Sequence, residues 1–195
     1  LATNSSCARL IGANGAFLAY AAPSASSGPL AVVPLRPHRV PDAQPLVLAH
    51  EEPLTDFASD PFDDCRWATA SHDGTVRLWR LPEGGLSAPL TQPAARLGHG
   101  TRVLAVDFHP HAQGLVVSLA KDRLVRFWDA ERVAVQARTA PLAREEAPLA
   151  FALDAADGRR MLVACKDLTA RLYDVRAPRR AVAVLPRAVE TERGF

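Results

Sequence analysis

A ten-residue motif occurs three times in this chain. It reads SHDGTVRLWR at residues 71–80, AKDRLVRFWD at 120–129 and CKDLTARLYD at 165–174. In each copy an aspartate stands in a short polar turn, and the residues after it alternate between apolar and polar as in a strand. These aspartates, Asp73, Asp122 and Asp167, lie 49 and 45 residues apart. Such a repeat predicts that one supersecondary unit is built three times.

Other elements keep the same spacing. His50 and His99 each stand 23 residues before the aspartate of their copy. An apolar stretch and a polar turn lie in between, as in LTDFASDPFDD at 54–64 and LAVDFHPHAQG at 104–114. The third copy has PLAFALDAADG at 148–158. The unit is therefore strand, turn, strand, tight turn, strand, and its length is close to the ~40 to 45 residues of a four-stranded propeller blade.

The remaining sequence favours an all-β chain. No long stretch keeps the period of an amphipathic helix, and 16 prolines and 11 glycines separate short apolar runs. We divide the chain into a partial blade and linker at 1–45, repeats at 46–92 and 93–140, and a degenerate repeat with the start of a further blade at 141–195.

The composition argues against several classes of function. Charged residues make up 23% of the chain and the net charge is only +2, so nothing indicates nucleic-acid binding. No run of about 18 apolar residues predicts a transmembrane segment. Cys7, Cys65 and Cys165 lack metal-ligand spacing, and no phosphate-binding glycine motif is present. We expect a cytoplasmic protein without a cofactor or a metal.

Five short motifs occur in order along the chain: PFDD at 61–64, LPEGGL at 81–86, FHP at 108–110, CKD at 165–167 and DVR at 174–176. With these motifs and the repeats combined, the chain resembles the WD repeats of the coronin family of actin-associated proteins. The resemblance covers nearly the whole chain, and LTDFASDPFDD is similar to the tandem-propeller coronins. The resemblance implies a seven-bladed WD-repeat β-propeller, of which this chain supplies about half, and hence a segment of a longer protein.

The resemblance also implies a structural role for the repeated polar residues. In a WD blade a histidine, a serine or threonine on the middle strand, the turn aspartate and the tryptophan hydrogen-bond to one another. The expected members are His50, Ser71, Asp73 and Trp79 in the first repeat, and His99, Asp122 and Trp128 in the second, where Ala120 takes the serine position.

The third repeat departs from this pattern. Tyr173 replaces the tryptophan, Cys165 replaces the serine, and Arg144 or Glu145 stands where histidine is expected before Asp167. We expect packing, more than polar contacts, to hold this repeat.

The first repeat also allows a catalytic interpretation. Ser71, His50 and Asp73 are the residue types of a nucleophilic triad. The second copy has Ala120 in place of the serine, which a scaffold tolerates and a catalytic site does not. We therefore predict that the chain is not an enzyme.

Arginines provide the candidate partner-binding residues. Arg77, Arg126 and Arg171 recur at one position of the motif, either as solvated strand residues or as part of a basic face for acidic actin. A denser cluster follows at Arg176, Arg179, Arg180 and Arg187, which is either solvated surface or an actin contact.

One acidic cluster could imitate a metal site. Asp60, Asp63 and Asp64 lie within a turn, where aspartate is favoured because its carboxylate accepts local backbone hydrogen bonds. We interpret the cluster as turn chemistry.

The resemblance implies a function in the cytoskeleton. It implies binding to actin filaments, organisation of the actin cytoskeleton and vesicle or Golgi trafficking, in the cytoplasm and with peripheral association with vesicles. The alternative is a general WD-repeat adaptor that binds other proteins in a multiprotein complex, for example a ubiquitin-ligase assembly.

Overall fold

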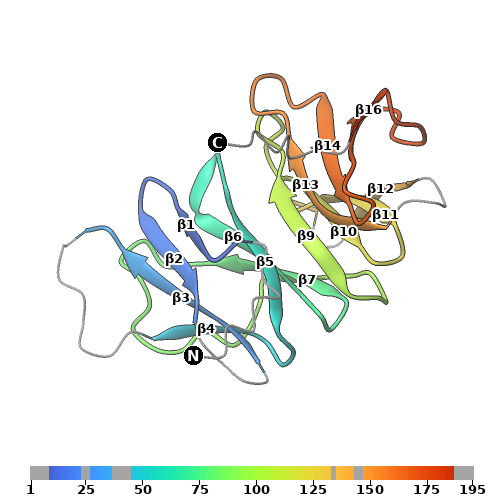
Figure 1. Cartoon of the computed structure of the whole chain (residues 1–195). Helices are drawn as coiled ribbons and strands as arrows, with labels where there is room; N and C mark the ends of the chain where they lie inside the picture. Colours follow the sequence, from blue (N-terminus) through green and yellow to red (C-terminus); the bar gives the residue numbers. More distant parts are fainter. Residues whose placement is uncertain (1–8, 23–26, 37–44, 133–134, 143–146, 187–195) are drawn as a thin grey trace, which may run out of the picture.

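The computed structural model describes residues 9–22, 27–36, 45–132, 135–142 and 147–186. These residues form sixteen β-strands and no helix, which confirms the prediction of an all-β chain. Each group of four consecutive strands makes one antiparallel sheet, and Figure 1 shows the four sheets following one another in sequence order. The described part of the chain therefore has no helix that could cross a membrane.

Within each sheet the strands pair in chain order. The first sheet contains β1 (Ile11–Ala13), β2 (Phe17–Ala21), β3 (Gly28–Pro34) and β4 (Leu46–His50). The second contains β5 (Leu54–Asp60), β6 (Asp63–Ser71), β7 (Thr75–Arg80) and β8 (Ala95–Gly98). The third contains β9 (Val103–Phe108), β10 (Leu115–Ala120), β11 (Leu124–Asp129) and β12 (Val135–Pro141). The fourth contains β13 (Pro148–Leu153), β14 (Arg160–Cys165), β15 (Ala170–Asp174) and β16 (Ala183–Leu185).

The sheets are out of step with the sequence repeats. The repeats that we place at 46–92 and 93–140 begin with β4 and β8, and each of these strands pairs as the last strand of the preceding sheet. Segment 1–45 thus supplies three strands of a sheet that β4 completes. The division of the sequence remains a prediction about repeats, whereas hydrogen bonding between strands decides where a sheet ends.

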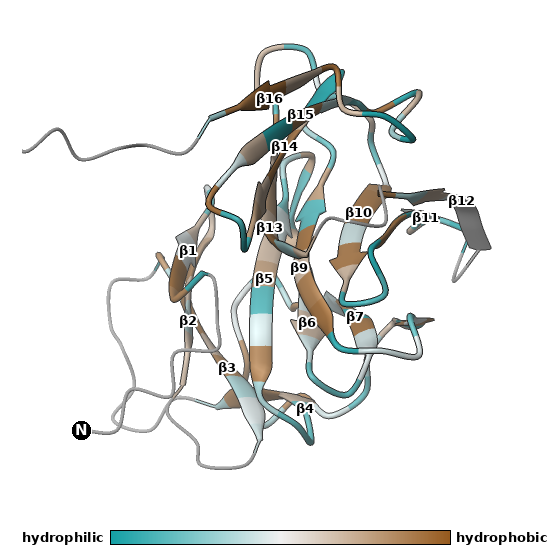
Figure 2. Cartoon of the chain, turned by 45° about the vertical axis from the view of Figure 1, so that its right-hand side comes forward, coloured by the Kyte–Doolittle hydropathy of each residue, from teal (hydrophilic) through white to brown (hydrophobic). Residues whose placement is uncertain are grey.

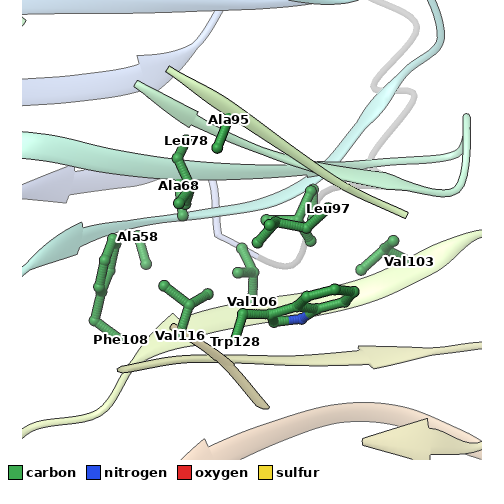
Figure 3. Close-up of a cluster of buried hydrophobic side chains, with 12 residues drawn as sticks. Ala58, Ala68, Leu78, Ala95, Leu97, Val103, Val106, Phe108, Val116 and Trp128 are labelled. Atoms are coloured by element: carbon green, nitrogen blue, oxygen red, sulfur yellow. The ribbon is translucent and has the colours of Figure 1, made fainter. Parts of the chain in front are cut away.

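The first strands of neighbouring sheets lie side by side. β5 contacts β9, and β9 contacts β13, as both Figure 1 and Figure 2 show. The faces of neighbouring sheets pack against each other and bury three apolar clusters, one at each junction. Figure 3 shows the middle cluster, in which Ala68, Leu78 and Leu97 of the second sheet face Val106 and Trp128 of the third. Alanines opposite a tryptophan let the two faces fit closely.

The outer faces of the first and fourth sheets carry exposed apolar side chains. Leu18 and Tyr20 on β2 are each 39% exposed, while Leu162 on β14 and Val184 on β16 are 37% and 55% exposed. Figure 2 shows hydrophobic segments on β1 and β16, in the first and last sheets. These faces have the apolar composition that the middle sheets bury against their neighbours.

The motif turns share one backbone conformation. The residue after the turn aspartate has φ of +77° at Gly74, +64° at Arg123 and +64° at Leu168. In all three turns the aspartate Oδ1 accepts the backbone N–H two residues further on, at 2.8, 2.9 and 3.0 Å. The Asp-Gly pair of the first copy fits this geometry without strain, but an arginine or leucine does not.

Replacing Leu168 by glycine should raise the free energy of unfolding by about 0.5 to 1 kcal/mol. Relief of the left-handed strain, about 1 to 2 kcal/mol, exceeds the entropy that a glycine adds to the unfolded chain. Chemical denaturation of the chain measures the change. Gly74→Ala is the reverse control and should destabilise, because its new Cβ would lie 3.1 Å from the Thr101 backbone nitrogen. A stabilising Gly74→Ala, or a destabilising Leu168→Gly, would contradict the strain argument.

Candidate functional site

A buried hydrogen-bonded chain joins the first sheet to the second. The Trp79 indole N–H donates to Thr69 Oγ1 (2.9 Å), and His50 Nε2 lies 2.8 Å from the same oxygen. His50 Nδ1 lies 2.8 Å from Asp73 Oδ2. Because a carboxylate only accepts, Nδ1 carries the imidazole hydrogen and Nε2 accepts from the Thr69 hydroxyl. The bonds therefore run in one direction, from Trp79 through Thr69 and His50 to Asp73.

Ser71 is not the middle-strand hydroxyl of this network, which corrects our expectation. Its hydroxyl donates to the carbonyls of Glu52 (3.1 Å) or Pro53 (3.0 Å) and accepts the Asp73 N–H (3.2 Å). Thr69, two residues earlier on β6, supplies the middle-strand hydroxyl that bonds to His50 and Trp79. The serine has no hydrogen bond to the histidine, so the geometry of a nucleophilic triad is absent from these residues.

The second network repeats this arrangement with one change. His99 Nε2 lies 2.6 Å from Ser118 Oγ, to which the Trp128 indole donates at 2.7 Å. Arg126, rather than Asp122, contacts His99 Nδ1. A guanidinium only donates, so Nδ1 must accept and the imidazole hydrogen sits on Nε2. The two histidines thus carry their hydrogen on opposite ring nitrogens.

At the junction of the third and fourth sheets Leu142, directly after β12, takes the place of the histidine. Its backbone N–H donates to the carbonyl of Arg123 (2.9 Å), just as the His99 N–H donates to Gly74 (2.8 Å). The accepting residue is in both cases the positive-φ residue of a motif turn. The hydrogen bond therefore identifies Leu142 as the equivalent residue.

Packing replaces the polar network at this junction. Leu142 is buried, Val163 stands where the first two networks have Thr69 and Ser118, and Tyr173 is fully buried in the same apolar cluster. Cys165, which we aligned with Ser71, is also buried.

The repeated arginines are not solvated strand residues, which corrects that interpretation. Each pairs with the turn aspartate four residues earlier: Arg77 with Asp73 at 3.2 Å, Arg126 with Asp122 at 3.0 Å and Arg171 with Asp167 at 2.8 Å. Their side chains are only 12%, 12% and 15% exposed. Ion pairs of this kind hold the turn against the strand and neutralise its carboxylate.

The surroundings of the two networks shift their titration. Burial lowers the pKa of His50, and burial together with Arg126 lowers the pKa of His99 to about 4. Burial alone would raise the pKa of Asp73, but hydrogen bonds from His50 and Thr75 outweigh it and lower this pKa to about 2. Both histidines are therefore neutral in the folded protein at neutral pH.

A second polar cluster joins the first strands of the second and third sheets. Asp56 Oδ2 accepts the Val106 N–H at 3.1 Å, and Arg9 donates to the Phe57 carbonyl (3.0 Å) and to Asp107 (3.2 Å). Burial raises the pKa of Asp56 to about 6, although Arg9 opposes the shift. The sequence did not predict this cluster, because its members lie 48 to 98 residues apart and do not repeat.

The remaining arginine candidates lie together at one end of the fourth sheet. Arg176, Arg179 and Arg180 are exposed in the β15–β16 connection. Arg159 and Arg160 are exposed beside them, because the Val175 N–H donates to the Arg159 carbonyl. We name these five residues the arginine end; the sequence motifs identified only three of them.

The acidic turn behaves as turn chemistry. Asp60 Oδ1 accepts the Phe62 N–H (2.8 Å), and Asp63 Oδ1 accepts the Cys65 N–H (3.0 Å). Asp64 accepts the Gly15 N–H from the first sheet at 3.2 Å. Within the described residues no group of three or more metal-ligating side chains is arranged to hold an ion.

Four residues of the sequence analysis lie outside the described residues: Cys7, Arg144, Glu145 and Arg187.

Several known proteins are similar to this chain in sequence. The family model "WD domain, G-beta repeat" (WD40) matches residues 44–80 and 91–129. Coronin-7 of Bos taurus is 39% identical over 153 residues, or 77% of this chain and 16% of that protein. Coronin-7 of Homo sapiens is 37% identical over 154 residues, or 78% and 16%. Coronin-2A of Homo sapiens is 29% identical over 169 residues, or 84% and 32%.

A solved structure matches over nearly the whole chain. The crystal structure of the WD40 domain of Toxoplasma gondii coronin superposes with a TM-score of 0.74 at 26% identity, covering 95% of this chain and 46% of that one. The four sheets therefore correspond to about half of a WD-repeat propeller, as the repeats predicted.

Proposed function

Because the chain is a WD-repeat protein of the coronin family, we propose that it forms part of a propeller that binds actin filaments and organises the actin cytoskeleton. The chain spans 16% of the length of its Coronin-7 relatives, so the proposal concerns what this segment contributes. The protein acts in the cytoplasm as a non-enzymatic scaffold, and it associates peripherally with Golgi or vesicle membranes.

The arginine end is the observation that carries the proposal. Its five arginines are exposed on one sheet, and a surface of this charge attracts an acidic filament. The neighbouring carboxylates of Asp157 and Asp174 are engaged with the backbone N–H groups of Arg159 and Arg176, both at 2.8 Å. Arg77, Arg126 and Arg171 are less suited to this role, because they are largely covered and paired.

Filament co-sedimentation tests the proposal. The chain should pellet with actin filaments at low salt, and the pelleted fraction should fall as the salt concentration rises. The variant Arg179→Glu/Arg180→Glu should bind at least tenfold more weakly. The matched control Arg36→Glu/Arg96→Glu reverses two exposed arginines outside the fourth sheet and should bind as the parent does.

Two outcomes would contradict filament binding through the arginine end. A chain that stays in the supernatant at all salt concentrations would favour the general adaptor over the filament-binding protein. Equal losses in both double variants would indicate attraction by net charge alone and would remove the arginine end as the binding surface.

A further inference from the structure

We propose that the motif turns of the second, third and fourth sheets form a docking surface for an extended acidic segment of a partner protein. The turns are β6–β7, β10–β11 and β14–β15, and we name them the turn row. The turn row lies at the other end of β15 from the arginine end, so the inference stands whether or not filaments bind there.

The turn row presents a basic residue type at one repeated position. His72, Lys121 and Lys166 each stand directly before the turn aspartate. Their backbone N–H groups donate to the residue that precedes the first strand of their own sheet: Pro53 at 3.1 Å, Arg102 at 2.9 Å and Ala147 at 2.9 Å. The shared hydrogen bond holds the three residues at the same height on three consecutive sheets.

The nearby carboxylates do not cancel this charge. The turn aspartates are already neutralised by Arg77, Arg126 and Arg171. Lys121 and Lys166 are exposed, and Arg102 adds a third cation between His72 and Lys121. Burial and the charge of Arg102 lower the pKa of His72, and Glu51 and Glu52 are exposed at the same end of the second sheet, so the positive charge of the turn row lies toward the third and fourth sheets.

Two buried polar atoms at the junction of the second and third sheets have no hydrogen-bond partner among the described residues. They are Nε2 of His72 and Nε of Arg102, on neighbouring sheets. The sheets meet here closely, since a Cβ at Gly74 would lie 3.1 Å from the Thr101 nitrogen. The junction covers both atoms, so the groups that a docked segment reaches are the exposed ammonium groups of Lys121 and Lys166.

The distance between neighbouring sheets determines how far apart the acidic residues of the docked segment must be. Sheets that pack face to face lie about 10 Å apart. A polyproline II segment has three residues per turn and rises about 3.1 Å per residue, so every third side chain lies on one face and about 9 Å from the last, which matches successive positions of the turn row. The structure assigns to this surface a segment with Asp or Glu at i, i+3 and i+6.

Two labelled peptides test the assignment. Each is a nine-residue peptide of serine and glycine with three glutamates, at positions 1, 4 and 7 in one peptide and at positions 1, 2 and 3 in the other. Fluorescence anisotropy should show at least fivefold tighter binding of the spaced peptide, weakening as salt is added. Equal affinity of the two peptides, or no binding of either, would overturn the proposal.

Substitutions locate the surface. Lys121→Glu/Lys166→Glu should weaken binding of the spaced peptide at least tenfold, and the neutral variant Lys121→Gln/Lys166→Gln should weaken it less. Arg179→Glu/Arg180→Glu makes the same charge change at the arginine end and should leave peptide binding unchanged. Equal losses in the two charge-reversal variants would overturn the assignment. So would binding of phosphatidylserine vesicles through Lys121 and Lys166 without peptide binding.

Discussion

Replacing Thr69 by valine is expected to lower the free energy of unfolding by about 2 to 6 kcal/mol, although the change keeps the shape of the side chain. The Thr69 hydroxyl is the centre of the first network, where it accepts from the Trp79 indole and bonds to His50. Valine leaves both of these buried groups unpaired, at about 1 to 3 kcal/mol for each. Denaturant titration, followed by Trp fluorescence, measures the loss.

Two control variants separate the loss of this network from the general effect of a Thr-to-Val change and from the loss of another buried hydroxyl. Thr101→Val makes the same substitution at an exposed site and should change stability by less than about 0.5 kcal/mol. Ser71→Ala should cost about 1 kcal/mol, since its hydroxyl bonds only to backbone groups. If Ser71→Ala proved more damaging than Thr69→Val, Ser71 would be the central hydroxyl and the network described above would be wrong.

The fourth sheet has a valine at the position of Thr69, which shows that valine is harmful only where the other members of the polar network are present. Val163 occupies the position of Thr69 there and lies in one apolar cluster with Leu142 and Tyr173, while Asp167 still pairs with Arg171 at 2.8 Å. Leucine and valine thus replace the histidine and the threonine together, so neither replacement leaves the other polar group unpaired. Loss of one member is the unfavourable case.

The sequence predicted the strands and the turns well, because both depend on local patterns. The period-two alternation and the turn aspartates are readable within ten residues, and the three aspartates accept the same backbone hydrogen bond. The network hydroxyl was missed because the motif was read from Ser71 onward. A usable signal was present: Thr69 and Ser118 both stand 10 residues before a tryptophan and 19 after a histidine.

Other features could not be read from spacing. Leu142 precedes its turn aspartate by 25 residues, whereas His50 and His99 precede theirs by 23. Loops change length at little energetic cost, so a fixed spacing pointed to the wrong residues. The contact of Arg9 with Asp107 joins residues 98 positions apart, and it depends on how two sheets pack. Such contacts follow from tertiary structure alone.

Replacing Asp56 by asparagine is expected to make the acid sensitivity of the fold steeper by about 3 kcal/mol between pH 7 and pH 4. Burial raises the pKa of Asp56 to about 6 from an ordinary value of 3.8, so the folded protein holds a proton that the unfolded chain releases. The stability from this proton is full below pH 3.8 and is lost as the pH rises through 6. Asparagine removes this contribution.

His99 changes stability in the opposite direction over the same window. Its pKa is lowered to about 4 by burial and Arg126, so its contribution is full above the ordinary value of 6.5 and is lost as the pH falls through 4. The loss is roughly 3 kcal/mol, at 1.36 kcal/mol per unit. In the parent chain the gain at Asp56 offsets most of this loss, and Asp56→Asn removes that offset. Asp73, with a pKa near 2, contributes mainly below this window.

The measurement is the free energy of unfolding at several pH values from 4 to 7 for three proteins. In the parent, the contributions of Asp56 and His99 to the free energy of unfolding should nearly cancel between pH 7 and pH 4. In Asp56→Asn, the free energy of unfolding should fall more steeply as the pH is lowered. Asp157→Asn changes an exposed carboxylate whose oxygen bonds to the Arg159 N–H, and asparagine can keep that bond, so its curve should run parallel to the parent. Parallel curves for the parent and Asp56→Asn would show that Asp56 is ionised at pH 4 to 7. The hydrogen bond from Val106 and the charge of Arg9 would then outweigh the burial of that carboxylate.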